Sequence, residues 1–160
     1  MNDQERKELL KKFMRKVSQP VFVVTARAGD NFAGFTATSV TSLSLNPPLF
    51  MVGVEKGTNS EKVLREAKFF AIHLLVKGQE WIAKKMSEKI PAQEKLNAVG
   101  YVLINELPII NDSYAYVILE KKSIWDVGDH IVVIGEVMDG KVEEITKPLV
   151  YHERNYTTSC

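Results

Sequence analysis

Residues 20–54 read PVFVVTARAGDNFAGFTATSVTSLSLNPPLFMVGV, and this stretch decides the fold class. Its apolar runs are rich in β-branched and aromatic residues, which are typical of strands. Residues 28–31 and 46–48 carry the Gly, Asp, Asn and Pro that form turns, and two consecutive prolines cannot donate ladder hydrogen bonds. We therefore expect a hairpin over residues 20–38 and further strands over Leu43–Leu45 and Leu49–Val54.

The segment before this stretch has the pattern of an amphipathic helix. Apolar residues repeat at helical spacing over residues 3–17, at Leu9, Leu10, Phe13, Met14 and Val17. The helix also carries Asp3, Glu5 and Glu8, and these acidic side chains disfavour a position on a lipid surface. We expect the helix to dock on the rest of the domain.

Short helices interrupt the strands after residue 54. Thr58 and Glu61 have the spacing of a capping box, and the apolar residues that follow predict a short helix. A second helix is expected after Gly78. Further strands are predicted over 69–76, 114–119 and 131–137, whereas residues 87–112 have no sustained period.

Many strands with few helices predict a mainly β fold, an antiparallel barrel with short helical inserts. A doubly wound parallel sheet fits poorly, because that fold alternates strands with helices and residues 20–54 contain no helix pattern. The chain also lacks the glycine-rich dinucleotide motif, the P-loop and the nucleophile-elbow motif. At 160 residues, we expect a single domain over 1–160.

Composition excludes several classes of partner. Lys plus Arg total 21 against 20 for Asp plus Glu, so the chain lacks the excess positive charge that favours nucleic acid. No apolar run reaches the roughly 18 to 20 residues that span a bilayer, and residues 1–16 do not resemble a signal peptide. The chain is expected to be soluble and cytoplasmic. Its single cysteine, Cys160, is expected to have no role, and no metal site is predicted.

Residues 34–48, GFTATSVTSLSLNPP, are the best candidate for a binding site. Six hydroxyl side chains occur within residues 36–44, next to the small residues Gly34 and Ala37. Such a ribbon offers many hydrogen-bond donors to a phosphate or to a planar, acceptor-rich ring. From spacing alone, the alternative is a half-exposed strand filled with threonine and serine.

Four blocks of the chain, in order, resemble the flavin reductase family. The first is the ribbon itself, which is similar to the family's G-x-T-A-x-S-x-x-S-[VL]-S-L-x-P-P block. The others are FAIHLL at 70–75, GDH at 128–130 followed by VIGEV at 133–137, and PLVYHERNY at 148–156. The family resemblance implies an FMN-binding split β-barrel, antiparallel and Greek-key-like, that forms a homodimer with flavin sites near the subunit interface.

The same resemblance implies which residues bind FMN or FAD. Thr36, Ala37, Thr38 and Ser39 would line the flavin, and Ser42 would support that loop. The phosphate and ring edge would be held by Glu55, Lys56, Asn59 and Ser60. This agrees with elementary electrostatics, because the amide groups and positive dipole at the start of a helix near Ser60 attract an anion. At His73 the family commonly has asparagine, so this position is a departure within the implied flavin site.

For the cosubstrate, NADH or NADPH, the resemblance implies a set centred on His130. This histidine would act near the nicotinamide as the catalytic residue, together with Tyr151, His152, Arg154 and Tyr156. Without the resemblance, a histidine after Gly-Asp would more often be an ordinary turn residue.

The implied activity is NAD(P)H:flavin oxidoreductase, with hydride passing from nicotinamide to flavin. Reduced flavin would be supplied to a partner monooxygenase, or its electrons would pass to ferric iron. The alternatives are a non-catalytic FMN-binding protein or an oxidase of another substrate on the same fold, and a small β-barrel binding module without a cofactor.

Overall fold

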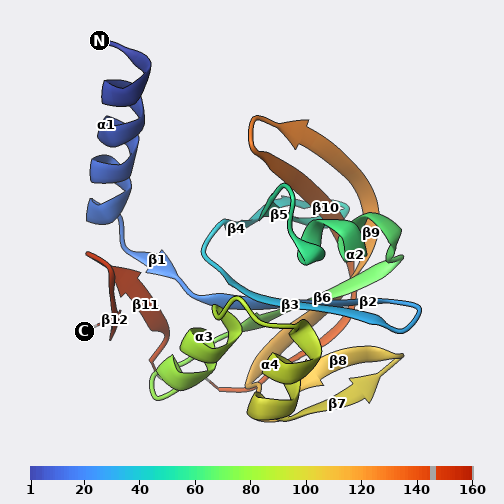
Figure 1. Cartoon of the computed structure of the whole chain (residues 1–160). Helices are drawn as coiled ribbons and strands as arrows, with labels where there is room; N and C mark the ends of the chain where they lie inside the picture. The colour runs from blue at the N-terminus through green and yellow to red at the C-terminus, as the bar shows by residue number, and fades with distance from the viewer. Residues whose placement is uncertain (145–146, 160) are drawn as a thin grey trace.

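The computed structural model describes residues 1–144 and 147–159 (Figure 1). Helices and strands follow in the order α1 (Asp3–Lys16), β1 (Gln19–Pro20), β2 (Phe22–Ala28), β3 (Asn31–Ala37), β4 (Val40–Leu45), β5 (Pro48–Glu55), α2 (Asn59–Glu66), β6 (Phe69–Leu74), α3 (Glu80–Met86), α4 (Ala92–Val99), β7 (Tyr101–Ile104), β8 (Leu107–Ile110), β9 (Ala115–Val127), β10 (His130–Val142), β11 (Leu149–His152) and β12 (Asn155–Thr158). The mainly β, antiparallel architecture expected from the sequence is confirmed.

A seven-stranded sheet with the order β3-β2-β6-β9-β10-β5-β4 forms the centre of the molecule. Its edge strands, β3 and β4, are joined only by Thr38 and Ser39, so the sheet must curl until its two edges meet. The backbone amide of Gly53 on β5 donates to the carbonyl of Ser39 at 2.8 Å, which extends the β4–β5 pairing into this link. The hydroxyl ribbon therefore lies where the barrel closes.

The connection from β5 to β6 gives the sheet its Greek-key character. It carries α2 and passes over the positions that β9 and β10 later occupy in the sheet. β9 and β10 then form a long hairpin that pairs with β6 on one side and β5 on the other. This topology holds strands from distant parts of the sequence in one register.

Alternating side chains of β2 serve two separate cores. Val24 and Ala26 point into the barrel interior with Phe70 and Leu119, whereas Val21 and Val23 pack outward against α3 and α4. Because side chains alternate between faces, a strand buried on both sides reads as the continuous apolar run seen in the sequence.

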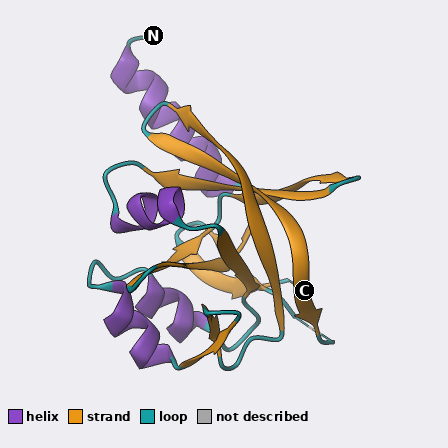
Figure 2. Cartoon of the chain, turned by 90° about the vertical axis from the view of Figure 1, so that its right-hand side faces the viewer, coloured by secondary structure: helices purple, strands orange, loops and turns teal. Residues whose placement is uncertain are grey.

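The three short helices lie on both sides of β2 and β3. In Figure 1, α2 lies above these strands and α3 and α4 lie below them, and Figure 2 shows the same separation from the side. Val63 and Leu64 bury the apolar face of α2 in the barrel core, while Ile82 and Leu96 anchor α3 and α4 in the outer core. This arrangement creates two walls along β3.

The expectation that α1 docks on the domain is wrong for most of its length. None of its residues is buried, and the helix projects from the body of the molecule (Figure 1). Its last turn is attached by an ion pair between Lys16 and Glu153 at 2.6 Å and by a hydrogen bond from the Glu153 amide to the Arg15 carbonyl. An apolar stripe predicts that a helix face will be covered, but it does not identify what covers it.

Most other expected elements match. The hairpin over 20–38, both strands over 43–54 and the helices after Thr58 and Gly78 are confirmed. The segment 87–112, which had no period, contains α4 and the β7–β8 hairpin. Cys160 lies outside the described residues. Among the described helices, none combines the length and apolar composition that a bilayer-spanning helix requires.

Candidate functional site

A cavity of about 1110 Å³ lies along β3, between α2 on one side and the segment from α3 to α4 on the other. Ligand sites in proteins commonly measure roughly 300–1,000 Å³, so this cavity can hold a nucleotide-sized molecule. Its lining brings together several residues that the sequence singled out: Thr36, Ala37, Thr38, Ser39, Glu55, Asn59, Ser60 and His130. The ribbon and the start of α2 thus converge on one space.

The hydroxyl ribbon forms the wall where the barrel closes. Gly53 faces this wall, and a side chain there would place its Cβ only 3.1 Å from the Cβ of Ser39. Glycine therefore allows Ser39 to lie close against β5. The hydroxyl of Thr36 is already engaged, because it donates to the Ala83 carbonyl of α3 at 2.7 Å. Backbone groups and the hydroxyls of Thr38 and Ser39 are left to contact a ligand.

The N-terminus of α2 forms a second part of the wall. The Thr58 hydroxyl accepts from the Glu61 amide at 3.2 Å, and the Glu61 carboxylate accepts from the Gly57 amide at 2.8 Å. Thr58 therefore caps the helix as predicted, but the Glu61 carboxylate bonds the Gly57 amide and not the Thr58 amide that would complete a capping box. The Gly57 hydrogen bond is the main cause that lowers the pKa of Glu61. The Asn59 side chain donates to the Phe32 carbonyl at 2.9 Å and ties the helix start to β3. The first amides of a helix have no intrahelical partner, so this end favours an anion.

His130 begins β10 at the rim of the cavity, opposite Glu55 of β5 in the sheet register. Its Nδ1 lies 2.7 Å from a carboxylate oxygen of Asp129, and this hydrogen bond lowers the pKa of Asp129. The side chain of His130 is 44% exposed. Asp129 thus orients the imidazole of His130, and the other edge of the ring stays accessible from the cavity rim.

Comparison with known proteins identifies the family of this chain. The family model described as flavin reductase like domain matches residues 14–159. The chain belongs to the flavin reductase family. Its match includes the ribbon, the start of α2 and the strand that carries His130.

Two curated relatives of known activity cover most of the chain. NADH:FMN oxidoreductase from Rhodococcus qingshengii is 31% identical over 147 residues, which cover 89% of this chain and 77% of that protein. The reductase component of 4-hydroxyphenylacetate 3-monooxygenase from Thermus thermophilus is 32% identical over 150 residues, covering 94% of this chain and 95% of that protein.

Solved structures of flavin reductases have the same fold. Flavin reductase HpaC complexed with NADP+ has a TM-score of 0.88 at 32% identity, and the match covers 96% of this chain and 97% of that one. The NADH:FAD oxidoreductase SgcE6 of Streptomyces globisporus, in complex with NAD and FAD fragments, has a TM-score of 0.90 at 25% identity, covering 100% and 96%.

Two of the residues that the flavin reductase resemblance implied lie outside the cavity lining. Lys56 forms an ion pair with Asp126 at 3.3 Å, and Asp126 also accepts from Arg65 at 3.0 Å. Ser42 lies on β4 and pairs with Phe50 in the register of the sheet. The structure thus directs the Lys56 ammonium toward β9 instead of toward the ribbon.

His73 is also outside the cavity, in the core. It is 0% exposed, its Nδ1 lies 2.9 Å from the Val23 carbonyl, and its Nε2 lies 3.2 Å from the Ile110 amide. Both ring nitrogens therefore have partners within the fold, and none is left for a flavin. His73 thus ties β8 to the barrel and is not part of the candidate site.

The C-terminal residues of the implied nicotinamide set form a separate group. Tyr151 and Tyr156 contact each other with ring centroids 5.3 Å apart and ring planes tilted by 55°, and they pack against the core that contains Met86. His152 and Arg154 line a smaller cavity of about 300 Å³ between α1 and the β11–β12 turn. Of that set, only His130 lines the large cavity.

The opposite wall of the cavity was missed by sequence reasoning. It is formed by the end of α3, the following link and the first turn of α4: Met86, Ser87, Glu88, Lys89, Ile90, Pro91, Ala92, Gln93 and Lys95. This stretch has no hydrophobic period, and its only signal is a charged, proline-containing link between short helices.

Proposed function

We propose that this chain is an NAD(P)H:flavin oxidoreductase that transfers a hydride from NADH or NADPH to FMN or FAD. The observation that carries the proposal is the convergence of the hydroxyl ribbon, the α2 N-terminus and His130 on one cavity. The names of the relatives at 31% and 32% identity support the same reaction class.

The cavity fits a flavin in size and in the groups that line it. A bound flavin supplies the ring that accepts a hydride from reduced nicotinamide. In our proposal, Thr38, Ser39 and the backbone of residues 36–37 hold the polar edge of the ring. The free amides of Asn59 and Ser60 at the α2 N-terminus receive negative charge. The walls along β3 exclude water and orient the two reactants, which is the main contribution that a protein makes to such a transfer.

His130 is proposed to orient the nicotinamide. Asp129 holds one ring nitrogen at 2.7 Å, so the opposite nitrogen can contact the carboxamide of a nicotinamide at the rim. Because Glu55 faces His130 across the sheet, the rim presents polar groups from both strands.

Steady-state kinetics tests this proposal. Purified protein with added FMN should oxidise NADH or NADPH, and His130→Ala should lower kcat/KM for the nicotinamide about 10-fold or more, the effect of losing one good hydrogen bond. The Kd for FMN should change less than about 2-fold, since the ribbon and α2 are unchanged. Tight FMN binding without any turnover would instead favour a non-catalytic flavin-binding protein. Equal loss of nicotinamide use and FMN affinity would show that His130 is misassigned.

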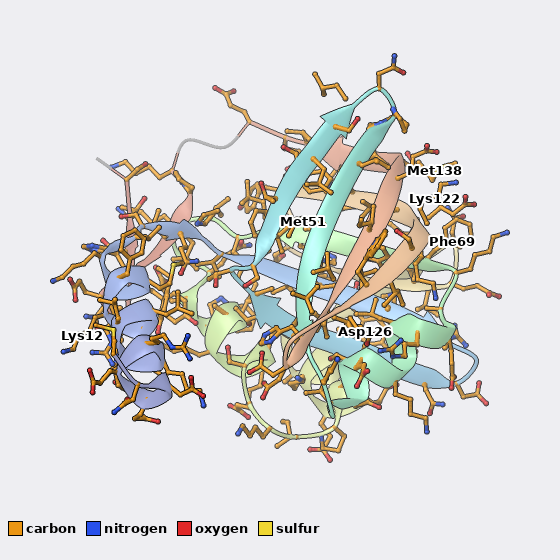
Figure 3. The ribbon with its side chains drawn as sticks, turned by 90° about the horizontal axis from the view of Figure 1, so that it is seen from above. Lys12, Met51, Phe69, Lys122, Asp126 and Met138 are labelled. Carbon is orange, nitrogen blue, oxygen red and sulfur yellow. The ribbon has the colours of Figure 1, made fainter. Side chains whose placement is uncertain are left out.

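A homodimer is the second part of the proposal. The outer face of β4, β5 and β10 carries apolar side chains, and no helix lies over β4 and β5 in Figure 3, where Met51 is labelled. On β4, Leu43 is 50% exposed and Leu45 is 92% exposed. Soluble monomers rarely expose large continuous apolar patches, so a second copy is the proposed partner for this face.

Sedimentation equilibrium at micromolar concentration should therefore give a mass of twice 18.1 kDa. Leu45→Glu together with Leu43→Glu should shift the equilibrium toward the monomer, because each introduces a charge on β4 within the proposed interface. A monomeric wild type at these concentrations would contradict the homodimer.

A flavin-dependent monooxygenase is proposed as the acceptor of reduced flavin, as the name of the Thermus thermophilus relative suggests. A cytoplasmic location stays a prediction.

A further inference from the structure

The carbonyl of Ala83, in the last turn of α3, accepts hydrogen bonds from both β3 and the end of α3. The Thr36 hydroxyl of β3 donates to it at 2.7 Å, and the Ser87 hydroxyl donates to it at 2.6 Å. The Ser87 amide lies 3.1 Å from the same oxygen. A carbonyl oxygen has two lone pairs, so these donors use its full capacity. The protons of two hydroxyls that line the cavity are therefore engaged within the protein.

The end of α3 rests directly on β3. Gly34 and Thr36 are two residues apart on this strand, so they present the same face to α3. A Cβ at Gly34 would lie 2.6 Å from Met86 Cε, which shows how closely the helix approaches. Ala83 and Met86 are both 0% exposed. The contact thus has an apolar part, Met86 on Gly34, and a polar part, the Thr36 hydroxyl on Ala83.

The link that follows α3 forms the part of the opposite wall nearest to this contact. Residues 87–91 all line the cavity and are all exposed. The amides of Ser87 and Glu88 bond back to the carbonyls of Ala83 and Lys85 in the last turn of α3. An exposed link has few buried contacts of its own, so its position depends on the elements at its ends. The end of α3 therefore determines where this wall stands relative to the hydroxyl ribbon.

We infer that Thr36 is a positioning residue of the flavin site: its hydroxyl holds the end of α3 on β3, and so fixes the α3–α4 wall, instead of donating to the flavin. The inference rests on the proposed function, because that proposal makes this wall enclose the flavin. The backbone of Thr36 stays available to the ligand, as do the hydroxyls of Thr38 and Ser39. Removal of the Thr36 hydroxyl should therefore loosen the wall even before a flavin binds, and weaken flavin binding as a consequence.

Hydrogen–deuterium exchange of the flavin-free protein, followed by NMR, tests the first consequence. Thr36→Val keeps the shape of the side chain and removes the hydroxyl, while the Ala83 carbonyl keeps its donors from Ser87, so no buried acceptor is left unpaired. Exchange of the Ser87 and Glu88 amides should become about 3- to 10-fold faster, the effect of losing one net hydrogen bond. Thr36→Ser retains the hydroxyl and should stay within about 2-fold of the wild type.

Fluorescence titration with FMN tests the second consequence. Thr36→Val should raise the Kd for FMN about 3- to 10-fold, and Thr36→Ser should change it less than about 2-fold. Thr25→Val is the matched control, because the Thr25 hydroxyl on the neighbouring strand β2 also donates to a backbone carbonyl, that of Pro108, at 2.7 Å, but Thr25 does not line the cavity. Thr25→Val should lower the urea midpoint at least as much as Thr36→Val and leave both the Ser87 exchange and the Kd for FMN within about 2-fold of the wild type.

Three results would overturn the inference. Weaker FMN binding by Thr36→Val with unchanged amide exchange would show that the hydroxyl contacts the flavin directly. Equal effects of Thr36→Val and Thr25→Val would reflect a general loss of stability, and equal effects of Thr36→Val and Thr36→Ser would exclude the hydroxyl as the cause. If Thr36→Val is poorly folded by circular dichroism, Thr36→Ala replaces it, since Ala and Ser differ only in the hydroxyl. A wild type that binds none of FMN, FAD and riboflavin would refute the proposed function itself, while the exchange of the flavin-free protein would still report on the wall.

Discussion

Acidification from about pH 7 to about pH 4 should lower the free energy of unfolding by about 3 kcal/mol through His73 alone. The ring is fully buried between three strands, with Nδ1 at the Val23 carbonyl and Nε2 at the Ile110 amide. The neutral tautomer with its proton on Nδ1 satisfies both contacts. A second proton on Nε2 would face the Ile110 N–H, donor against donor.

The direction of this pH dependence follows from the pKa. Burial is the main cause that lowers the pKa of His73 from 6.5 to about 4 in the folded protein. Between these values the unfolded chain binds the proton and the folded chain does not, so stability falls as the pH falls. The pKa of His73 in the unfolded chain, 6.5, exceeds its pKa in the folded protein, about 4, by 2.5. Since one pKa unit is equivalent to about 1.4 kcal/mol, this difference corresponds to about 3 kcal/mol of unfolding free energy. Above about pH 7 the contribution is constant.

Urea unfolding at several pH values measures this effect. His73→Gln should be less stable than the wild type near neutral pH by about 1–3 kcal/mol, because the Ile110 amide loses a well-placed acceptor. Its stability should also depend less on pH between about 6.5 and 4. His152→Gln, a change at the C-terminal hairpin, is the matched control and should retain the wild-type slope. An unaltered slope in His73→Gln would attribute the acid sensitivity to other groups.

Strand positions and the capping of α2 could be predicted because their causes are local. Each signal lies within a few residues: the apolar runs that predict β2 and β5, and the Thr58–Glu61 pair that predicts the start of α2. Short-range patterns of this kind depend little on the rest of the fold. The convergence of the ribbon with the start of α2 depended on the family resemblance, since 19 residues separate Ser39 from Thr58 in the sequence.

The cationic part of the site could not be predicted in the same way. Lys56 lies next to α2 in the sequence, which favours it as a phosphate ligand. In the structure its ammonium forms an ion pair with Asp126 of β9, which is distant in the sequence. Lys95 lies in a stretch without periodicity, and it lines the cavity through the packing of α3 and α4 on β3, where Gly34 leaves room for Met86 and Leu96. Long-range pairings decide both outcomes, and a single sequence contains no local signal for them.

His73 and α1 illustrate two further limits. A histidine on a strand has the same appearance in the sequence whether its ring faces a ligand or a core, and here both nitrogens find partners 37 and 50 residues away. The apolar face of α1 can be recognised in the sequence, but none of its residues is buried in the fold, so the pattern did not identify what covers that face.

Blocking the cavity from either wall should abolish flavin binding. Ser39 lies at the closure of the barrel and Ser60 in the first turn of α2, and both line the cavity. Ser39→Trp and Ser60→Trp, made separately, each introduce a large ring into the space assigned to the flavin. Each should raise the Kd for FMN at least about 100-fold, which corresponds to about 2.7 kcal/mol. Thr157→Trp, on an exposed position of β12 outside the lining, is the matched control.

The titration of FMN fluorescence with these three variants and the wild type tests the central claim most directly, since it asks whether two elements distant in the sequence enclose one flavin. We predict micromolar or tighter binding by the wild type and by Thr157→Trp, and loss of binding in both Ser39→Trp and Ser60→Trp. If folded Ser39→Trp and Ser60→Trp bind FMN as the wild type does, the cavity along β3 is not the flavin site.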